Sequence, residues 1–290
     1  ANEGLIKTAR KWASDTKGEG EHPFVTLVNS FHGRTLTTVT ATGQDTFHKF
    51  FGPFTPGFRY VPASDLAALE RQLDAEDCSA VLVEIVQGEG GVRALDADYL
   101  KAVEALCHEK NVLFCVDEVQ TGNGRTGTWF AYEQFGLSPD LVSTAKGLGN
   151  GLPIGATLMG SKTAEVLTPG THGSTFGGNP VACAGALSVL EQIDDAFLEA
   201  VKQKGAWLTA ELEKIPGVKD VSGLGLMLGF SVEGCKSADI KAKALDNGLV
   251  VLTAKDRVRL LPPLAITEEE LSDGLLRLAA AIREVQEAAH

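Results

Sequence analysis

Short runs of apolar residues alternate with segments in which apolar residues recur at helical spacing. This alternation predicts buried strands separated by amphipathic helices, because a helix buries one stripe of its surface and a central strand is apolar throughout. In the first 160 residues we expect strands at 24–28, 80–86, 112–116, 140–143 and 156–159, and helices at 64–73 and 96–110. Repeated strand–helix–strand units are typical of α/β folds, in which helices cover both faces of a mostly parallel sheet.

The later part of the chain carries clear helix signals. Residues 179–215 favour one long helix that begins at Asn179-Pro180 and ends before Pro216-Gly217. Two short strands, a helix over 237–247, two more strands and a helix from Thr267 onward should follow. The run from Thr267 to Glu270 fits a capping box, in which two side chains satisfy backbone amides of the first turn. We therefore expect two domains, residues 1–216 and 217–290.

Composition narrows the range of partners. The net charge of −12 disfavours nucleic acid and anionic membranes, because both attract basic surfaces. No apolar run approaches the roughly 20 residues that span a bilayer. The five cysteines form no C-x-x-C pair and lie mostly among apolar residues. We interpret them as reduced core residues of a cytoplasmic protein and expect no metal site.

Two residues that follow strands could carry chemistry. Asp117 follows the expected strand 112–116, and Lys146 follows the expected strand 140–143 and precedes a glycine-rich stretch. Ligands of parallel sheets bind beyond the carboxyl ends of the strands. A lysine amine condenses with an aldehyde cofactor to form a Schiff base, and a carboxylate can keep a pyridine nitrogen protonated. The spacing alone equally permits a surface salt bridge.

Five motifs then indicate a family. They are Phe31-His-Gly-Arg-Thr35, Val86-Gln-Gly-Glu-Gly-Gly91, Val116-Asp-Glu-Val-Gln-Thr-Gly122, Thr144-Ala-Lys-Gly147 and Thr171-His-Gly-Ser-Thr-Phe-Gly-Gly-Asn-Pro180. In this order they resemble the motifs of class III aminotransferases, which use pyridoxal 5'-phosphate. The resemblance extends over essentially the whole chain. It implies the type I fold of these enzymes, with the large domain and the C-terminal part of the small domain.

The resemblance assigns cofactor contacts residue by residue. Lys146 looks like the lysine that carries the cofactor and moves the catalytic proton, and Asp117 looks like the partner of the pyridinium nitrogen. Val119 and Phe31 would pack on the two faces of the ring. Gln120 would hydrogen-bond the phenolic oxygen of the ring.

The resemblance also assigns substrate contacts. Arg34 looks like the residue that binds the substrate α-carboxylate, which suits the planar guanidinium group. Arg259 resembles the arginine that holds the α-carboxylate of glutamate or 2-oxoglutarate. Glu89 resembles the glutamate that covers this arginine while the other amino donor is bound. Ser174 would lie at the substrate, and Thr175 would reach the cofactor phosphate of a partner subunit, so a homodimer is expected.

Within the family, the form of the run 171–180 is typical of members that act on N-acetylornithine. The implied reaction transfers the δ-amino group of N-acetylornithine to 2-oxoglutarate, a step of arginine biosynthesis. Two alternatives stay open. The first is a related class III enzyme that acts on succinylornithine, ornithine or 4-aminobutyrate. The second is an inactive chain with a scaffold role.

One expected motif is missing. The family normally has Ser-Gly-Thr-Glu directly before the equivalent of Ala1-Asn2-Glu3, and the backbone amides of that motif bind the cofactor phosphate at a helix N-terminus. Here the sequence starts at Ala1. These 290 residues are therefore either a fragment of a longer protein, which we favour, or an unusual short form. On their own we expect them to bind the cofactor weakly or not at all.

Overall fold

The computed structural model describes residues 1–74 and 77–288, which form two compact units. Unit 1 contains residues 1–85, 95–123 and 130–193. Unit 2 contains residues 86–94, 124–129 and the chain from Asp194 onward. No helix in the described ranges combines the length and the apolar character that crossing a membrane requires.

A six-stranded sheet with the order β2-β1-β3-β6-β7-β8 forms the centre of unit 1. Its strands are β1 (Phe24–Leu27), β2 (Phe58–Val61), β3 (Ala80–Val83), β6 (Leu113–Asp117), β7 (Leu141–Thr144) and β8 (Ala156–Met159). Neighbouring strands are parallel, except that β7 and β8 are antiparallel. The prediction of a mostly parallel α/β sheet is confirmed.

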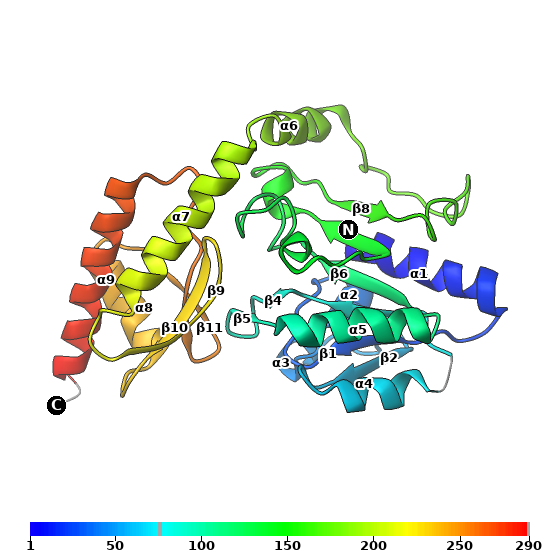
Figure 1. Ribbon diagram of the computed structural model, residues 1–290, viewed down its shortest axis with the longest axis horizontal. Coiled ribbons are helices and arrows are strands. Elements are labelled where there is room, and N and C mark those ends of the chain that lie inside the picture. Colours follow the sequence, from blue (N-terminus) through cyan, green and yellow to red (C-terminus); the bar gives the residue numbers. More distant parts are fainter. Residues whose placement is uncertain (75–76, 289–290) are drawn as a thin grey trace. The chain divides into compact units, whose positions relative to one another are not determined.

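Unit 1 also contains helices. They are α1 (Asn2–Lys17), α2 (Leu36–Ala41), α3 (Asp45–His48), α4 (Leu66–Leu73), α5 (Ala97–Glu109) and α6 (Pro180–Leu190), with 3₁₀ turns η1 (Ala131–Phe135) and η2 (Lys146–Leu148). The apolar face of α1, including Leu5 and Ile6, is buried against Leu82 and Leu113 of the sheet. Helices α4 and α5 lie side by side (Figure 1). Their N-caps, Asp65 and Asp96, accept hydrogen bonds from first-turn amides.

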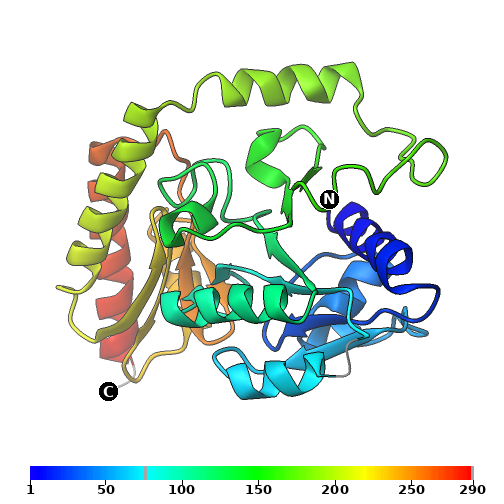
Figure 2. The ribbon, with the colours of Figure 1, turned by 45° about the vertical axis from the view of Figure 1, so that its right-hand side comes forward.

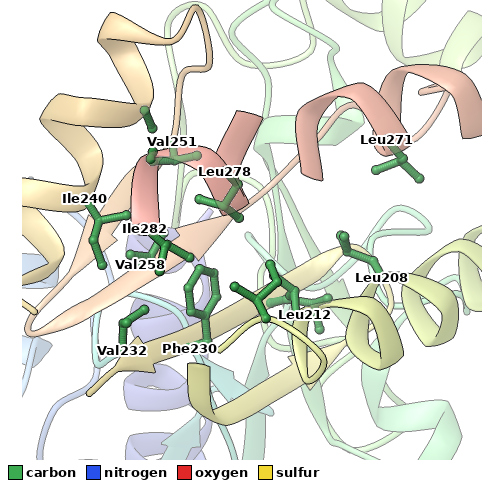
Figure 3. Packing of buried hydrophobic residues seen from close by; sticks show 14 of the residues in the cluster. Leu208, Leu212, Phe230, Val232, Ile240, Val251, Val258, Leu271, Leu278 and Ile282 are labelled. Atoms are coloured by element: carbon green, nitrogen blue, oxygen red, sulfur yellow. The ribbon is translucent and has the colours of Figure 1, made fainter. Parts of the chain in front are cut away.

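Unit 2 has an antiparallel sheet with the order β11-β12-β10-β9, together with a small β4–β5 hairpin. Its elements are β4 (Val86–Gln87), β5 (Arg93–Ala94), α7 (Asp195–Leu212), β9 (Val218–Leu224), β10 (Met227–Val232), α8 (Ser237–Asp246), β11 (Leu252–Ala254), β12 (Arg257–Leu260) and α9 (Glu268–Ala288). Helices α7 and α9 lie side by side (Figure 2). Phe230 of β10 and Val258 of β12 point toward Leu278 and Ile282 of α9 (Figure 3).

The capping box at the start of α9 is confirmed. The Thr267 backbone amide donates to Glu270 Oε2 at 2.8 Å, and the Glu270 amide donates to Thr267 Oγ1 at 3.1 Å. This reciprocal pair satisfies two amides that the helix itself leaves without partners. The start of the last helix could therefore be predicted from four consecutive residues.

The prediction of a single helix over 179–215 is wrong. Helix α6 ends at Leu190, and α7 begins at Asp195 after Asp194 accepts a hydrogen bond from the Phe197 amide at 2.8 Å. The change from unit 1 to unit 2 falls at this break, after Ile193, whereas the expected domain boundary lay near Pro216. Helix α7 belongs to unit 2 because its apolar face is buried in the core of that unit.

The strand expected over 80–86 is also divided. Strand β3 ends at Val83, and Val86 opens the separate β4–β5 hairpin. The run 80–86 is apolar except for Glu84, because both segments are fully buried. Burial alone could not show that they belong to different sheets.

Candidate functional site

The acidic residue and the lysine singled out from the sequence both follow strands of the unit 1 sheet. Asp117 is the last residue of β6 and pairs with Ser143 of the parallel neighbour β7. Strand β7 ends at Thr144, and Lys146 comes two residues later. Because the carboxyl ends of parallel strands meet at one edge, Asp117 and Lys146 belong to the same edge of the sheet.

Asp117 is buried, with a relative exposure of 4%, and several donors hold its carboxylate. Oδ2 accepts hydrogen bonds from the Asn2 side-chain amide at 2.7 Å and from His32 Nδ1 at 2.8 Å. Oδ1 accepts one from the Val119 backbone amide at 3.0 Å. The side chain is therefore fixed in orientation by residues from three parts of unit 1.

These contacts decide the charge of Asp117. Burial by itself would raise the pKa of the carboxyl group, because a low dielectric disfavours the charged form. The hydrogen bond and charge of His32, together with the donors Val119 and Asn2, act in the opposite direction, and the pKa is lowered. Asp117 is thus a permanent anion at neutral pH.

Asn2 and His32 were not among the residues proposed from the sequence. His32 lies inside the run Phe31–Thr35, which is the one signal that could have identified it. Asn2 also donates to the His32 carbonyl at 2.8 Å, so it joins the two other members of the cluster. The buried atoms Asn2 Oδ1 and His32 Nε2 have no hydrogen-bond partner among the residues that the structure describes.

Lys146 is exposed and begins the short turn η2. Its backbone is left-handed, with φ at 45°. The Asn123 side-chain amide donates to Thr144 Oγ1 at 2.9 Å and to the Ala145 carbonyl at 3.3 Å, which fixes the two residues before the lysine. Lys146 is therefore exposed to solvent, while hydrogen bonds from Asn123 hold the two residues before it in place.

Phe31 and Arg34 form a small aromatic and cationic group. The guanidinium carbon of Arg34 lies 5.2 Å from the centre of the Phe31 ring and 4.6 Å from that of Phe47. The Phe31 backbone amide donates to the buried carboxylate of Glu84 at 2.9 Å. Arg34 is exposed and forms no ion pair within the described residues, so its charge is available to an anion.

Val119 and Gln120 follow Asp117 on the loop after β6, and both are half-buried. Gln120 Oε1 is buried and has no hydrogen-bond partner in residues 1–74 and 77–288. An unsatisfied buried amide oxygen costs free energy, so such an atom commonly marks a place for a ligand or water. Gln120 is the third residue after Asp117 in the sequence.

Ser174 and Thr175 lie in the exposed turn segment before α6. Neither hydroxyl group makes a hydrogen bond to any residue of the described chain. The neighbouring Asn179 caps α6 by accepting from the Ala182 amide at 2.9 Å. The structure therefore does not bring these two hydroxyl groups into contact with the Asp117 cluster.

Glu89 and Arg259 meet within unit 2. Arg259 on β12 donates from Nη1 to Glu89 Oε1 at 2.7 Å. The Arg259 side chain is 9% exposed, whereas the Glu89 side chain is 28% exposed. Glu89 comes from the turn between β4 and β5. The two residues paired from the sequence are therefore joined by an ion pair.

Comparison with known proteins identifies the family. The class III aminotransferase family matches residues 1–282 of the chain. The chain belongs to the class III aminotransferases. Enzymes of this family are transaminases that depend on pyridoxal phosphate.

Among class III aminotransferases of known sequence, two similar relatives carry the same name. The acetylornithine aminotransferase of Haemophilus ducreyi is 50% identical over 286 residues, which cover 98% of this chain and 73% of that protein. The acetylornithine aminotransferase of Bacillus subtilis is 47% identical over 287 residues, which cover 97% of this chain and 73% of that protein.

Solved structures of class III aminotransferases agree in fold. The N-acetylornithine aminotransferase of Stenotrophomonas maltophilia matches with a TM-score of 0.85 and 36% identity, over 99% of this chain and 73% of that one. The ornithine aminotransferase of Toxoplasma gondii matches with a TM-score of 0.91 and 36% identity, over 99% of this chain and 71% of that one. The type I fold expected from the sequence is confirmed.

Proposed function

We propose that this class III aminotransferase transfers the δ-amino group of N-acetylornithine to 2-oxoglutarate, which yields N-acetylglutamate semialdehyde and glutamate. The observation that carries the proposal is the ion pair of Glu89 and Arg259, at 2.7 Å. A movable carboxylate over a buried arginine suits an enzyme whose two substrates differ in charge at one position. The names of the similar relatives support the same donor.

Residues of unit 1 fit pyridoxal phosphate. The buried carboxylate of Asp117 is ionised and can hold the proton on a pyridine nitrogen. The amide of Gln120, whose oxygen has no partner among the described residues, suits the phenolic oxygen, and Val119 and Phe31 suit the two faces of the ring. When bound, the cofactor supplies an electron-withdrawing ring. The amine of Lys146 would hold the cofactor and would then move the proton to and from the carbon that bears the amino group.

The cationic residues would orient the substrates. Arg34, which forms no ion pair within the described ranges, would bind the α-carboxylate of N-acetylornithine through its planar guanidinium group. Arg259 would bind the α-carboxylate of glutamate or 2-oxoglutarate after Glu89 moves away. When N-acetylornithine is bound, Glu89 would stay on Arg259 and neutralise it. Ser174 would contact the substrate.

We also propose that two copies of the chain assemble. Around α6, Phe176 is 83% exposed, Val181 70% and Leu187 59%. Apolar side chains exposed to this extent along one element favour an interface. Thr175, directly before Phe176, would reach the cofactor phosphate of the partner subunit. The reaction would serve arginine biosynthesis in the cytoplasm, in keeping with five cysteines that are free thiols.

The test compares amino donors in the complete enzyme loaded with pyridoxal phosphate. N-acetylornithine should be used with a higher kcat/KM than succinylornithine, ornithine and 4-aminobutyrate, with 2-oxoglutarate as the acceptor. A preference for ornithine would instead match the solved ornithine aminotransferase structures. Mass spectrometry after borohydride reduction should place the cofactor on Lys146, and Lys146→Ala should lose both the label and turnover. A chain without any transaminase activity would favour a scaffold role.

A further inference from the structure

The turn that carries Glu89 is fastened to the unit 2 sheet by a hydrogen-bond relay. Ser222 on β9 donates from Oγ to the Val92 carbonyl at 2.6 Å. Arg257 on β12 donates from Nη2 to Ser222 Oγ at 2.8 Å and to the Gly229 carbonyl at 2.6 Å, and also to the Asp220 carbonyl. A single buried side chain therefore connects β9, β10 and the end of the Glu89 turn.

Close packing reinforces this relay. A Cβ atom added to Gly91 would lie 3.1 Å from Arg257 Cδ, and one added to Gly229 would lie 2.7 Å from Val92 Cβ. Gly91 and Val92 both have positive φ values, 110° and 55°. Left-handed backbone is unfavourable for a β-branched residue such as valine, so surrounding contacts must hold it there. The Ser222 hydrogen bond to the Val92 carbonyl is one such contact.

Arg257 is unusual among the cations of this molecule. Its relative exposure is 1%, and it forms no ion pair within residues 1–74 and 77–288. All three of its acceptors are neutral: two backbone carbonyls and one hydroxyl group. Burying a guanidinium group without a carboxylate partner costs free energy. A neutral side chain would pack there at a lower cost, so the position calls for a role that needs the hydrogen-bond donors of Arg257.

We propose that Arg257 is a positioning residue for substrate selection: through Ser222 it holds the turn 88–92 so that Glu89 stays on Arg259. The inference rests on the proposed function, in which Glu89 neutralises Arg259 while N-acetylornithine is bound. A loosened turn leaves Arg259 uncovered for a larger fraction of the time. That change disfavours N-acetylornithine and favours the dicarboxylate, because only the dicarboxylate supplies a second carboxylate for Arg259.

Three variants and one control test the proposal in the complete, cofactor-loaded enzyme. Arg257→Met keeps the packing against Gly91 but removes the donors, Arg257→Lys keeps a donor and the charge, and Ser222→Ala removes the bond to the Val92 carbonyl. Ser231→Ala is the matched control, because Ser231 also bonds a backbone carbonyl of β9, that of Lys219, yet does not bond the turn. Two readouts apply: hydrogen exchange of the peptide 86–94, and single-turnover rates with N-acetylornithine and with glutamate.

We expect Arg257→Met and Ser222→Ala to accelerate exchange in 86–94 and to lower the ratio of kcat/KM for N-acetylornithine over glutamate roughly tenfold, the size of one lost hydrogen bond to a charged group. Arg257→Lys should recover part of the ratio, and Ser231→Ala should match the parent enzyme. In a Glu89→Gln background, Arg257→Met should no longer change the ratio, because interacting residues are not additive.

Three results would overturn the proposal: unchanged exchange in 86–94, equal losses in both half-reactions, or a shift of the ratio that persists in the Glu89→Gln background. A failure of the proposed function would give a different experimental result. In that case the parent enzyme itself does not turn over N-acetylornithine, while the exchange data still report whether Arg257 holds the turn.

Discussion

The two carboxylates for which we propose a function, Asp117 in unit 1 and Glu89 in unit 2, are held in opposite ways. Asp117 is 4% exposed, and its two oxygens accept hydrogen bonds from Asn2, His32 and Val119. The Glu89 side chain is 28% exposed and, within residues 1–74 and 77–288, is held by one hydrogen bond, from Arg259. This difference suits the proposed roles, in which the charge of Asp117 stays in place and that of Glu89 leaves its partner.

The largest effect should come from removing the fixed charge. Asp117→Asn keeps the shape of the side chain but cannot hold a proton on a pyridine nitrogen. We expect kcat to fall on the order of a thousandfold, as happens when a preorganised electrostatic group is lost. Cofactor binding, followed by absorbance titration, should weaken much less. A variant with a nearly normal rate would contradict the assignment.

Removing Arg259, the partner of Glu89, should impair one half-reaction and spare the other. Arg259→Ala removes the proposed site for the α-carboxylate of 2-oxoglutarate, and a lost charge-assisted bidentate contact corresponds to roughly tenfold to a hundredfold in affinity. The KM for 2-oxoglutarate should rise by that factor, while the half-reaction with N-acetylornithine is spared. Steady-state kinetics with each substrate varied in turn measures the difference. Equal damage to both half-reactions would show that Glu89 and Arg259 do not form a switch.

A third carboxylate, Glu118, should make the stability of the fold depend on pH. Burial raises the pKa of Glu118 to about 7, despite hydrogen bonds from Thr121 and from backbone amides. The folded state then binds the proton more tightly than the unfolded chain. Its contribution to stability is complete below the unfolded pKa of about 4.5 and is lost as the pH rises toward 7.

Glu118→Gln removes this titration. Urea unfolding of the parent protein between pH 4.5 and pH 7 should show a loss of stability on the order of 2 kcal/mol that the variant lacks. Asp117 has a lowered pKa and contributes in the opposite sense, with stability that is lost as the pH falls. An identical pH profile for the parent and the Glu118→Gln variant would show that Glu118 does not titrate in this range.

A smaller effect should follow from loosening the fixed charge without removing it. Asn2→Ala deletes one donor to Asp117 Oδ2 and leaves His32 and Val119 in place. One hydrogen bond to a charged group is worth about 1.5–3 kcal/mol. Because the other donors remain, we expect at most a tenfold loss of kcat, with the acid limb of the pH–rate profile moved to higher pH. Asn2→Asp places a second negative charge beside Asp117, so it should lower kcat more than Asn2→Ala does.

The features predicted correctly from the sequence are the local ones. The helices predicted over 64–73 and 96–110 are present, and Asp65 and Asp96 cap them through amides two or three residues away. Thr267 and Glu270 form the predicted capping box. The helix break at Asp194 was missed, although Asp194 is also a local cap. The residues on both sides of it are good helix formers, so a continuous pattern concealed the cap.

The environment of Asp117 could not be predicted in the same way. Asn2 lies 115 residues from Asp117 in the sequence, and His32 lies 85 residues away. Hydrogen bonds at such separations depend on the strand order of the sheet, which the pattern of apolar residues does not give. The pairing of Glu89 with Arg259, 170 residues apart, was reached only through family resemblance.

The left-handed backbone of Lys146, with φ at 45°, sets activity against stability at a single residue. A side chain with a Cβ atom costs on the order of 1 kcal/mol in this conformation, and glycine avoids that cost. The inactive variant Lys146→Gly should therefore resist urea better than the equally inactive Lys146→Ala. Selection for stability alone would favour glycine at this position, so in its proposed role as the cofactor-binding amine Lys146 is kept at the expense of the folded state.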